Sequence, residues 1–179
     1  MRVANLLVGK TLAEVGKNVL PGVTTNQLNK VAEEYIRDHG ATPTFLGFPN
    51  PYGEPFPAAI CASVNDQVVH GVPNDEPLKD GDIVTVDVGS IYKGYHSDSA
   101  YTYIVGKVDK KTEKFVNDTQ KALYKGISVV KEGIKLNEVC KAIESVAKEN
   151  GYGVFDCLTG HGVGRELHED PFIPNLSNH

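Results

Sequence analysis

The segment 83–105, with the sequence IVTVDVGSIYKGYHSDSAYTYIV, predicts a β-hairpin at the centre of the fold. Its two ends, 83–89 and 99–105, are rich in β-branched and aromatic residues, as strands are. Lys93 and Gly94 between them suit a two-residue turn. We therefore expect two antiparallel strands joined by a tight turn at these two residues.

The register that follows from this turn brings two carboxylates together. Gly89 would pair with Asp98 and Asp87 with Ala100, so that the aspartates become diagonal neighbours on one face, roughly 7–8 Å apart. That spacing lets them share metal ions held about 3.5–4 Å apart. A β-bulge would shift the register, and a single aspartate could instead accept backbone donors at a strand end. Two on one hairpin favour a metal site, because a buried carboxylate needs a compensating charge.

The chain also contains an internal repeat, because the segment 22–40 recurs at 133–151. Both copies have an apolar helical stripe with a polar residue near the start and glycine past the end. Unrelated amphipathic helices would share the stripe, but the identities favour a duplication. Further helices are expected over 3–19 and 115–130, so the predicted order is helix, helix, strands, twice. The identical pairs are Gly22/Gly133, Asn26/Asn137, Lys30/Lys141, Glu33/Glu144 and Gly40/Gly151.

Composition places the chain among ordinary globular proteins. It has 179 residues, 40% of them hydrophobic, which suffices for one domain with a core. The net charge of −5 without a basic stripe argues against a nucleic-acid partner, and no apolar run is long enough to cross a membrane. Three scattered cysteines, Cys61, Cys140 and Cys157, predict reduced thiols and a cytoplasmic location.

Two further features of the sequence could belong to a functional site. Glycines flank His161 in Gly160-His161-Gly162, which permits the close backbone approach that a ligand in a crowded site needs. The Pro- and Gly-rich loop 47–57 fits a specificity loop and a plain connector equally well. A lone histidine such as His70, at the end of an apolar run, is usually structural. For the remaining histidines we expect only a structural role; these are His39, His96 and His179.

Three blocks together resemble type I methionine aminopeptidases, which remove the initiator methionine from new proteins. They are Ser63-Val64-Asn65-Asp66-Gln67-Val68-Val69-His70-Gly71, the hairpin with Asp87 and Asp98, and Gly160-His161-Gly162-Val163-Gly164 through Leu167-His168-Glu169-Asp170-Pro171. The resemblance implies an α+β "pita-bread" fold, in which two pseudo-symmetric halves surround a dinuclear metal site. It implies a single catalytic domain over 1–179, with a first pseudo-repeat of about 1–106 and an incomplete second one of about 107–179.

The resemblance also implies roles for individual residues. Asp87, Asp98 and His161 correspond to ligands of two divalent ions, which could be Mn, Fe, Co or Zn. His70 and His168 correspond to histidines that contact the substrate and act in catalysis. The family lines its methionine pocket at the positions of Cys61, Phe56 and Leu167, although an aromatic residue is common at the last of these.

The family's two remaining ligands are glutamates further downstream, one of which is also the general base. The resemblance thus implies a chain cut at both ends, chiefly at the C-terminus, and we expect the 179-residue form to be inactive or weakly active. The expected substrate is the N-terminal methionine of nascent polypeptides near the ribosome, acted on by a cytoplasmic monomer. The alternative is a non-catalytic binding module of the same fold.

Overall fold

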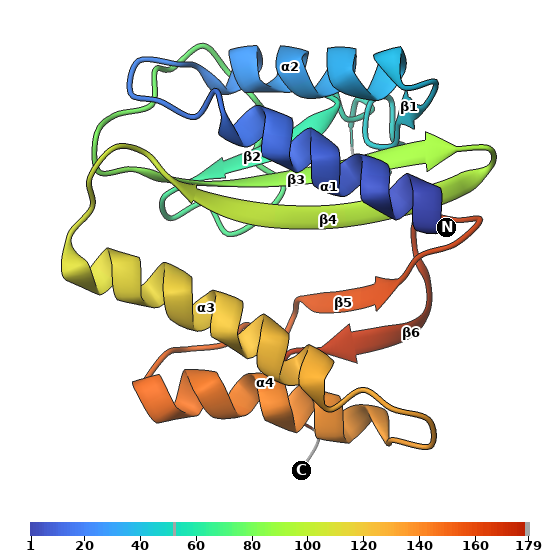
Figure 1. Ribbon diagram of the computed structural model, residues 1–179, viewed down its shortest axis with the longest axis vertical. Coiled ribbons are helices and arrows are strands. Elements are labelled where there is room, and N and C mark those ends of the chain that lie inside the picture. The colour runs from blue at the N-terminus through green and yellow to red at the C-terminus, as the bar shows by residue number, and fades with distance from the viewer. Residues whose placement is uncertain (52, 178–179) are drawn as a thin grey trace. The chain divides into compact units, whose positions relative to one another are not determined.

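The computed structural model describes residues 1–51 and 53–177. The chain divides into two compact units (Figure 1). Unit 1 consists of Met1–Val108 together with Val163–Leu167, and unit 2 of Asp109–Gly162 together with the residues from His168 onward.

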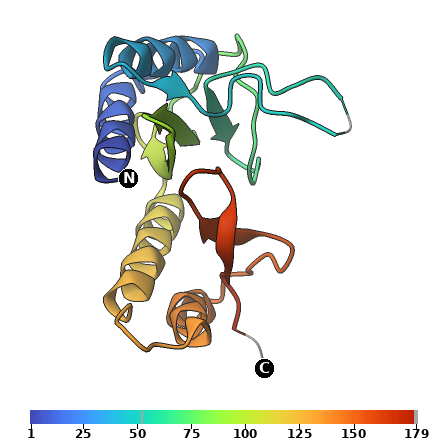
Figure 2. The same cartoon turned by 90° about the vertical axis from the view of Figure 1, so that its right-hand side faces the viewer.

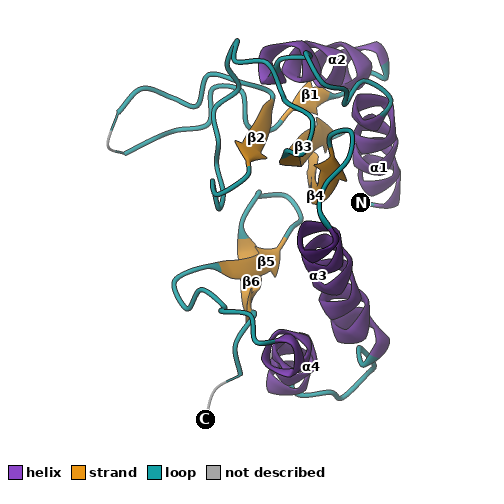
Figure 3. Cartoon of the chain, turned by 90° about the vertical axis from the view of Figure 1, so that its left-hand side faces the viewer, coloured by secondary structure: helices purple, strands orange, loops and turns teal. Residues whose placement is uncertain are grey.

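Unit 1 contains a four-stranded antiparallel sheet and two helices. β3 lies at the centre, with β4 on one side and with β1 and β2 on the other. The strands are β1 (Thr42–Pro43), β2 (Ile60–Val64), β3 (Ile83–Tyr92) and β4 (Tyr95–Ile104). The helices α1 (Arg2–Gly16) and α2 (Thr25–Asp38) cover one face of this sheet (Figure 3).

The core of unit 1 lies between these helices and the sheet. Val84, Val86 and Val88, which alternate along β3, are completely buried, as strand geometry requires of residues two apart. Leu28 and Ile36 of α2 are also completely buried and belong to the same cluster. The predicted apolar stripe of the first repeat copy is therefore the core-facing side of α2.

The predicted hairpin register is confirmed. Tyr92 pairs with Tyr95 around the turn at Lys93 and Gly94, both of which have positive φ, as such a turn requires. The pairing continues without a bulge along both strands. The strands are longer at the turn end than the predicted 83–89 and 99–105, because Ser90 and Ser97 continue the ladder with a hydrogen bond between their buried hydroxyls.

Two helix limits differ by a few residues from the approximate ranges expected. α1 ends at Gly16, not near residue 19; further along the chain, Leu20 precedes a proline, a position that disfavours the helical conformation. α3 begins at Lys110 instead of residue 115, because the Asp109 carboxylate caps it by accepting a hydrogen bond from the Thr112 N–H at 2.7 Å.

The long connection between β1 and β2 extends away from the sheet of unit 1 (Figure 2). It contains the predicted loop 47–57, which is closed at its base by a hydrogen bond from the Gly47 N–H to the Phe56 carbonyl. Tyr52 in this loop, and His179 at the end of the chain, lie outside the described residues.

Unit 2 repeats the order of helix, helix and strands, as predicted. It consists of α3 (Lys110–Ser128), α4 (Leu136–Asn150), β5 (Thr159–Gly162) and β6 (Glu169–Pro174). The two helices approach closely at Gly126, where a Cβ atom would lie 2.7 Å from the Ile143 side chain. α4 ends at Asn150, and the C-cap residue Gly151 that follows has the left-handed conformation, which favours glycine.

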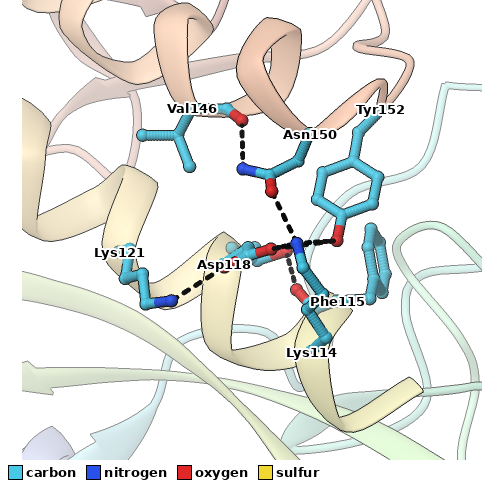
Figure 4. Close-up of polar contacts among 8 residues, drawn as sticks. Lys114, Phe115, Asp118, Lys121, Val146, Asn150 and Tyr152 are labelled. Atoms are coloured by element: carbon cyan, nitrogen blue, oxygen red, sulfur yellow. Dashed lines mark hydrogen bonds and ion pairs between the residues drawn. The ribbon is translucent and has the colours of Figure 1, made fainter. Parts of the chain in front are cut away.

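A buried carboxylate links α3 to the chain that follows α4. Asp118 of α3 accepts hydrogen bonds from Lys114, from Lys121 at 2.9 Å and from the Tyr152 hydroxyl at 3.0 Å (Figure 4). Lys114 also donates to Asn150. The two lysines and the hydroxyl hold the pKa of the Asp118 carboxyl well below its usual range, so that the carboxylate stays ionised.

We expect Asp118→Asn to destabilise unit 2 at neutral pH. The native pKa lies below the ordinary value of 3.8, so the stabilisation is complete above that value and is lost as the pH falls below it. Urea unfolding at about pH 7 and about pH 3 should show a gap between wild type and variant that narrows in acid. Glu149→Gln, which removes an exposed ion pair with Lys125, is the control and should change little. An equal gap at both pH values would contradict this prediction.

Candidate metal and substrate site

Asp87 and Asp98 lie side by side on neighbouring strands. Gly89 pairs with Asp98 and Asp87 pairs with Ala100, so the two carboxylates occupy diagonal positions on one face of the hairpin. Both residues are half-buried, and the carboxyls lie within hydrogen-bonding reach of each other. The interior neighbours Val86 and Val88 point to the opposite face, which leaves this face of the hairpin to the polar pair.

The proximity of the two carboxyls changes their protonation. Burial, together with the charge of the nearby Asp98, raises the pKa of Asp87 to about 7. Burial also raises the pKa of Asp98. Two half-buried carboxylates in contact repel each other, and either a shared proton or a bound cation relieves the repulsion. This donor set fits a divalent cation, which binds oxygen ligands and supplies the missing positive charge.

His70 lies in the loop that follows β2 and is exposed. Its imidazole is close enough to Asp87 to lower the pKa of that carboxyl, an effect smaller than those of burial and Asp98. Its φ is 56°, in the left-handed region that only a few per cent of residues other than glycine adopt. The predicted structural role of a lone histidine does not account for an exposed imidazole beside a half-buried carboxyl pair.

A small apolar cluster adjoins the carboxylates in unit 1. Cys61, whose Cα partner across the strands is Asp87, packs with Leu167, Phe45 and the half-buried Phe56. The structure thus brings together the three residues predicted to line a methionine pocket. Sequence reasoning missed Phe45, whose local signal is an aromatic residue two positions before the Pro- and Gly-rich loop.

His161 and His168 lie together in unit 2. Their rings make an edge-to-face contact with centroids 4.4 Å apart. The His161 Nδ1 hydrogen-bonds the Gly162 carbonyl at 2.9 Å, and donation to a carbonyl fixes the tautomer in which Nε2 carries the lone pair that metals bind. A Cβ atom at Gly162 would lie 2.5 Å from the Asp170 carbonyl oxygen, so the close backbone approach predicted beside His161 is confirmed there.

The predicted site residues therefore form two groups, one in each unit. Asp87, Asp98 and His70 belong to unit 1 with the Cys61 cluster, and His161 and His168 belong to unit 2. Among residues 1–51 and 53–177, no three His, Cys, Asp or Glu side chains form a group that could hold a metal ion.

Comparison with known proteins identifies relatives of the whole chain. A methionine aminopeptidase of Clostridium perfringens is 43% identical over 98% of this chain and 69% of its own length. Methionine aminopeptidase 1 of Bacillus subtilis is 41% identical, over 98% of this chain and 68% of its own length.

The crystal structure of methionine aminopeptidase from Rickettsia prowazekii superimposes with a TM-score of 0.92 at 42% identity, covering 99% of this chain and 69% of that one. The pita-bread α+β fold predicted from the sequence is thereby confirmed. The model of metallopeptidase family M24 matches residues 1–179, and the chain belongs to this family.

Proposed function

We propose that this chain is a methionine aminopeptidase that removes the N-terminal methionine of peptides and nascent proteins. The observation that carries the proposal is the contact of Asp87 with Asp98 on one face of the hairpin, next to the apolar Cys61 cluster. A metal-binding carboxylate pair beside an apolar cluster suits a hydrolase that recognises an apolar side chain. The names of the relatives support the same substrate.

In this proposal Asp87, Asp98 and His161 are metal ligands, and the cofactor is two divalent ions from among Mn, Fe, Co and Zn. Such ions supply Lewis acidity and a water of lowered pKa in hydrolases. Family membership supports a divalent metal cofactor, and carboxylate with imidazole is a donor set that all four metals accept.

The other residues bind and orient the substrate. The cluster of Cys61, Phe56 and Leu167 takes the methionine side chain, whose flexible thioether fits an irregular apolar surface. His70 and His168 contact the scissile amide and donate hydrogen bonds where negative charge develops on its oxygen. Both are exposed and are therefore accessible to a peptide.

The wider setting belongs to the same proposal. The chain would act as a single catalytic domain built from the pseudo-repeats 1–106 and 107–179, as a monomer, on nascent chains near the ribosome in the cytoplasm. No helix of the described residues is both long and apolar enough to cross a membrane. The three cysteines are free, which supports a reducing compartment.

Metal binding is the first prediction. Mn²⁺ or Co²⁺ should raise the thermal stability of the wild type, by about 2.7 kcal/mol at 100 times the Kd, because the ion binds only the folded state. Asp87→Asn should abolish most of this increase, whereas Asp66→Asn, at an exposed position in the same unit, should retain it. Equal stabilisation of both variants would show that the ion binds elsewhere, and none at all would favour a non-catalytic binding module.

Turnover is the second prediction. Because we expect the 179-residue form to be at most weakly active, incubation of the chain with Met-Ala-Ser and Mn²⁺ should release free methionine only slowly, and His161→Ala should lower that rate by at least about 10²-fold. His39→Ala, at an exposed histidine stacked on Tyr35, is the matched control. Chromatography of the products measures both. A chain that binds metal at Asp87 without releasing methionine would refute the proposed activity while leaving the metal site intact.

Thiol reactivity is the third prediction. Burial, with the charges of Asp87 and Asp98, raises the pKa of the Cys61 thiol to about 12, so almost no thiolate exists at pH 8. Iodoacetamide should therefore label the exposed Cys157 quickly and Cys61 only after unfolding. Peptide mapping by mass spectrometry gives the two rates in one sample. Labelling of Cys61 as fast as Cys157 would contradict its position in the buried cluster.

A further inference from the structure

The loop that carries His70 is fixed to β2 at its far end. The Ala62 N–H donates a hydrogen bond to the Gly71 carbonyl at 2.8 Å, and the Gly71 N–H donates to the Ser63 Oγ at 3.1 Å. Ser63 is only 4% exposed. Its hydroxyl therefore accepts the hydrogen bond of the buried Gly71 N–H, and buried backbone N–H groups in proteins are nearly always hydrogen-bonded.

Gly71 is the point of closest approach. A Cβ atom there would lie 2.3 Å from the Ala62 carbonyl oxygen and 2.9 Å from the Ser63 Cα, both of which are backbone atoms that cannot move aside. Only glycine fits this contact. The loop is thus held against β2 by two backbone groups of Gly71 and by one side chain, the Ser63 hydroxyl.

The near end of the loop is fixed as firmly. The Asn65 N–H donates to the Ile83 carbonyl at 3.0 Å, and the Asn65 Oδ1 accepts from the Ile83 N–H at 3.0 Å. The Asn65 Nδ2 also donates to Asp82. Both ends of the segment 65–71 are therefore attached to strands, and the strained residue lies between them, directly before Gly71.

The left-handed conformation of His70 is unfavourable for a residue with a Cβ atom and persists only where neighbouring structure fixes it. The Gly71 contacts supply this constraint on one side, and the Asn65 contacts supply it on the other. The resulting direction of the chain brings the exposed imidazole near Asp87, one strand away.

We propose that Ser63 is a positioning residue for the reaction: through the Gly71 N–H, its hydroxyl holds His70 in the strained conformation that directs the imidazole toward the carboxylate pair. The proposal rests on the substrate-contacting role of His70 in the proposed function. Without the hydroxyl, the Gly71 N–H hydrogen-bonds to water instead of to β2. The φ angle of His70 then relaxes to a negative value, so that its imidazole moves away from the carboxylate pair.

Backbone order tests the geometry without requiring activity. ¹⁵N relaxation of the full chain should give rigid order parameters of about 0.85 at His70 and Gly71, falling below about 0.6 in Ser63→Ala and recovering in Ser63→Thr. If Ser63→Ala unfolds, Ser63→Cys replaces it: its side chain is of similar size, but its sulfur accepts the Gly71 N–H hydrogen bond more weakly, so the order parameters should fall in the same way. Order retained at His70 in both Ser63→Ala and Ser63→Cys would overturn the proposal.

Thr25→Val is the matched control. Thr25 is 1% exposed, and its hydroxyl likewise accepts a hydrogen bond from a backbone N–H, that of Asn74, at 2.8 Å. The variant loses both hydrogen bonds that this hydroxyl makes with the Asn74 backbone, four residues beyond His70 in the sequence, and should leave the order of His70 and Gly71 unchanged. If Thr25→Val lowered the order parameters of His70 and Gly71 as much as Ser63→Ala does, the effect of Ser63→Ala would be general destabilisation, and the proposal would be overturned.

A double-mutant cycle tests the mechanism. Ser63→Ala should lower kcat on the order of 10–100-fold with a smaller change in KM, and should have no further effect in a His70→Ala background. An equal loss in both backgrounds would mean that Ser63 does not act through His70. If the wild type releases no methionine, the proposed function fails, and the relaxation measurements still decide whether Ser63 positions His70.

Discussion

The pairing of β3 with β4 is the constraint on which the candidate site depends. Side chains alternate along a strand, so one register decides the face of every residue on it. Val84, Val86 and Val88 are completely buried against the helices, and a slip by one residue would expose them and bury Thr85 and Asp87 instead. At about 1.5–3 kcal/mol for each valine, the core alone fixes the register. The carboxylate contact is thus a consequence of apolar packing on the opposite face.

Local signals explain what the sequence predicted well. The hairpin register follows from two turn residues and an alternating pattern, both contained in one short segment. The helix stripes follow from periodicity in the same way. What could not be predicted depends on residues distant in the sequence: Phe45 contacts the Cys61 cluster only in the folded chain, and Asp118 of α3 is hydrogen-bonded by Tyr152, which follows α4. The start of α3 at Lys110 depends on the Asp109 side-chain cap, a signal weaker than periodicity.

The two copies of the internal repeat share their order of helices and strands, but equivalent side chains in them make different contacts. Glu33 and Glu144 occupy equivalent positions in the two copies, yet Glu33 is only half-buried and pairs with the exposed Arg37. Glu144 is buried, binds Lys148 and accepts a hydrogen bond from the Ser177 hydroxyl at 2.6 Å, so that its pKa falls to about 2. The helix starts differ as well, because Thr24 forms a capping box and Lys135 makes no side-chain cap. Identity between the copies therefore does not transfer a role from one to the other.

Unit 1 is discontinuous in sequence, and this has a consequence for synthesis. Val163–Leu167 belongs to unit 1 although the segment 109–162 separates it from the rest. Leu167 completes the cluster around Cys61, and the Gly164 carbonyl accepts a hydrogen bond from the His96 N–H at 2.7 Å. At about 5–20 residues per second, the ribosome needs on the order of 3–10 s to make the intervening segment. During that interval the sheet and helices of unit 1 can form. Cys61 and Phe45 then lack their contact with Leu167, which has not yet been translated.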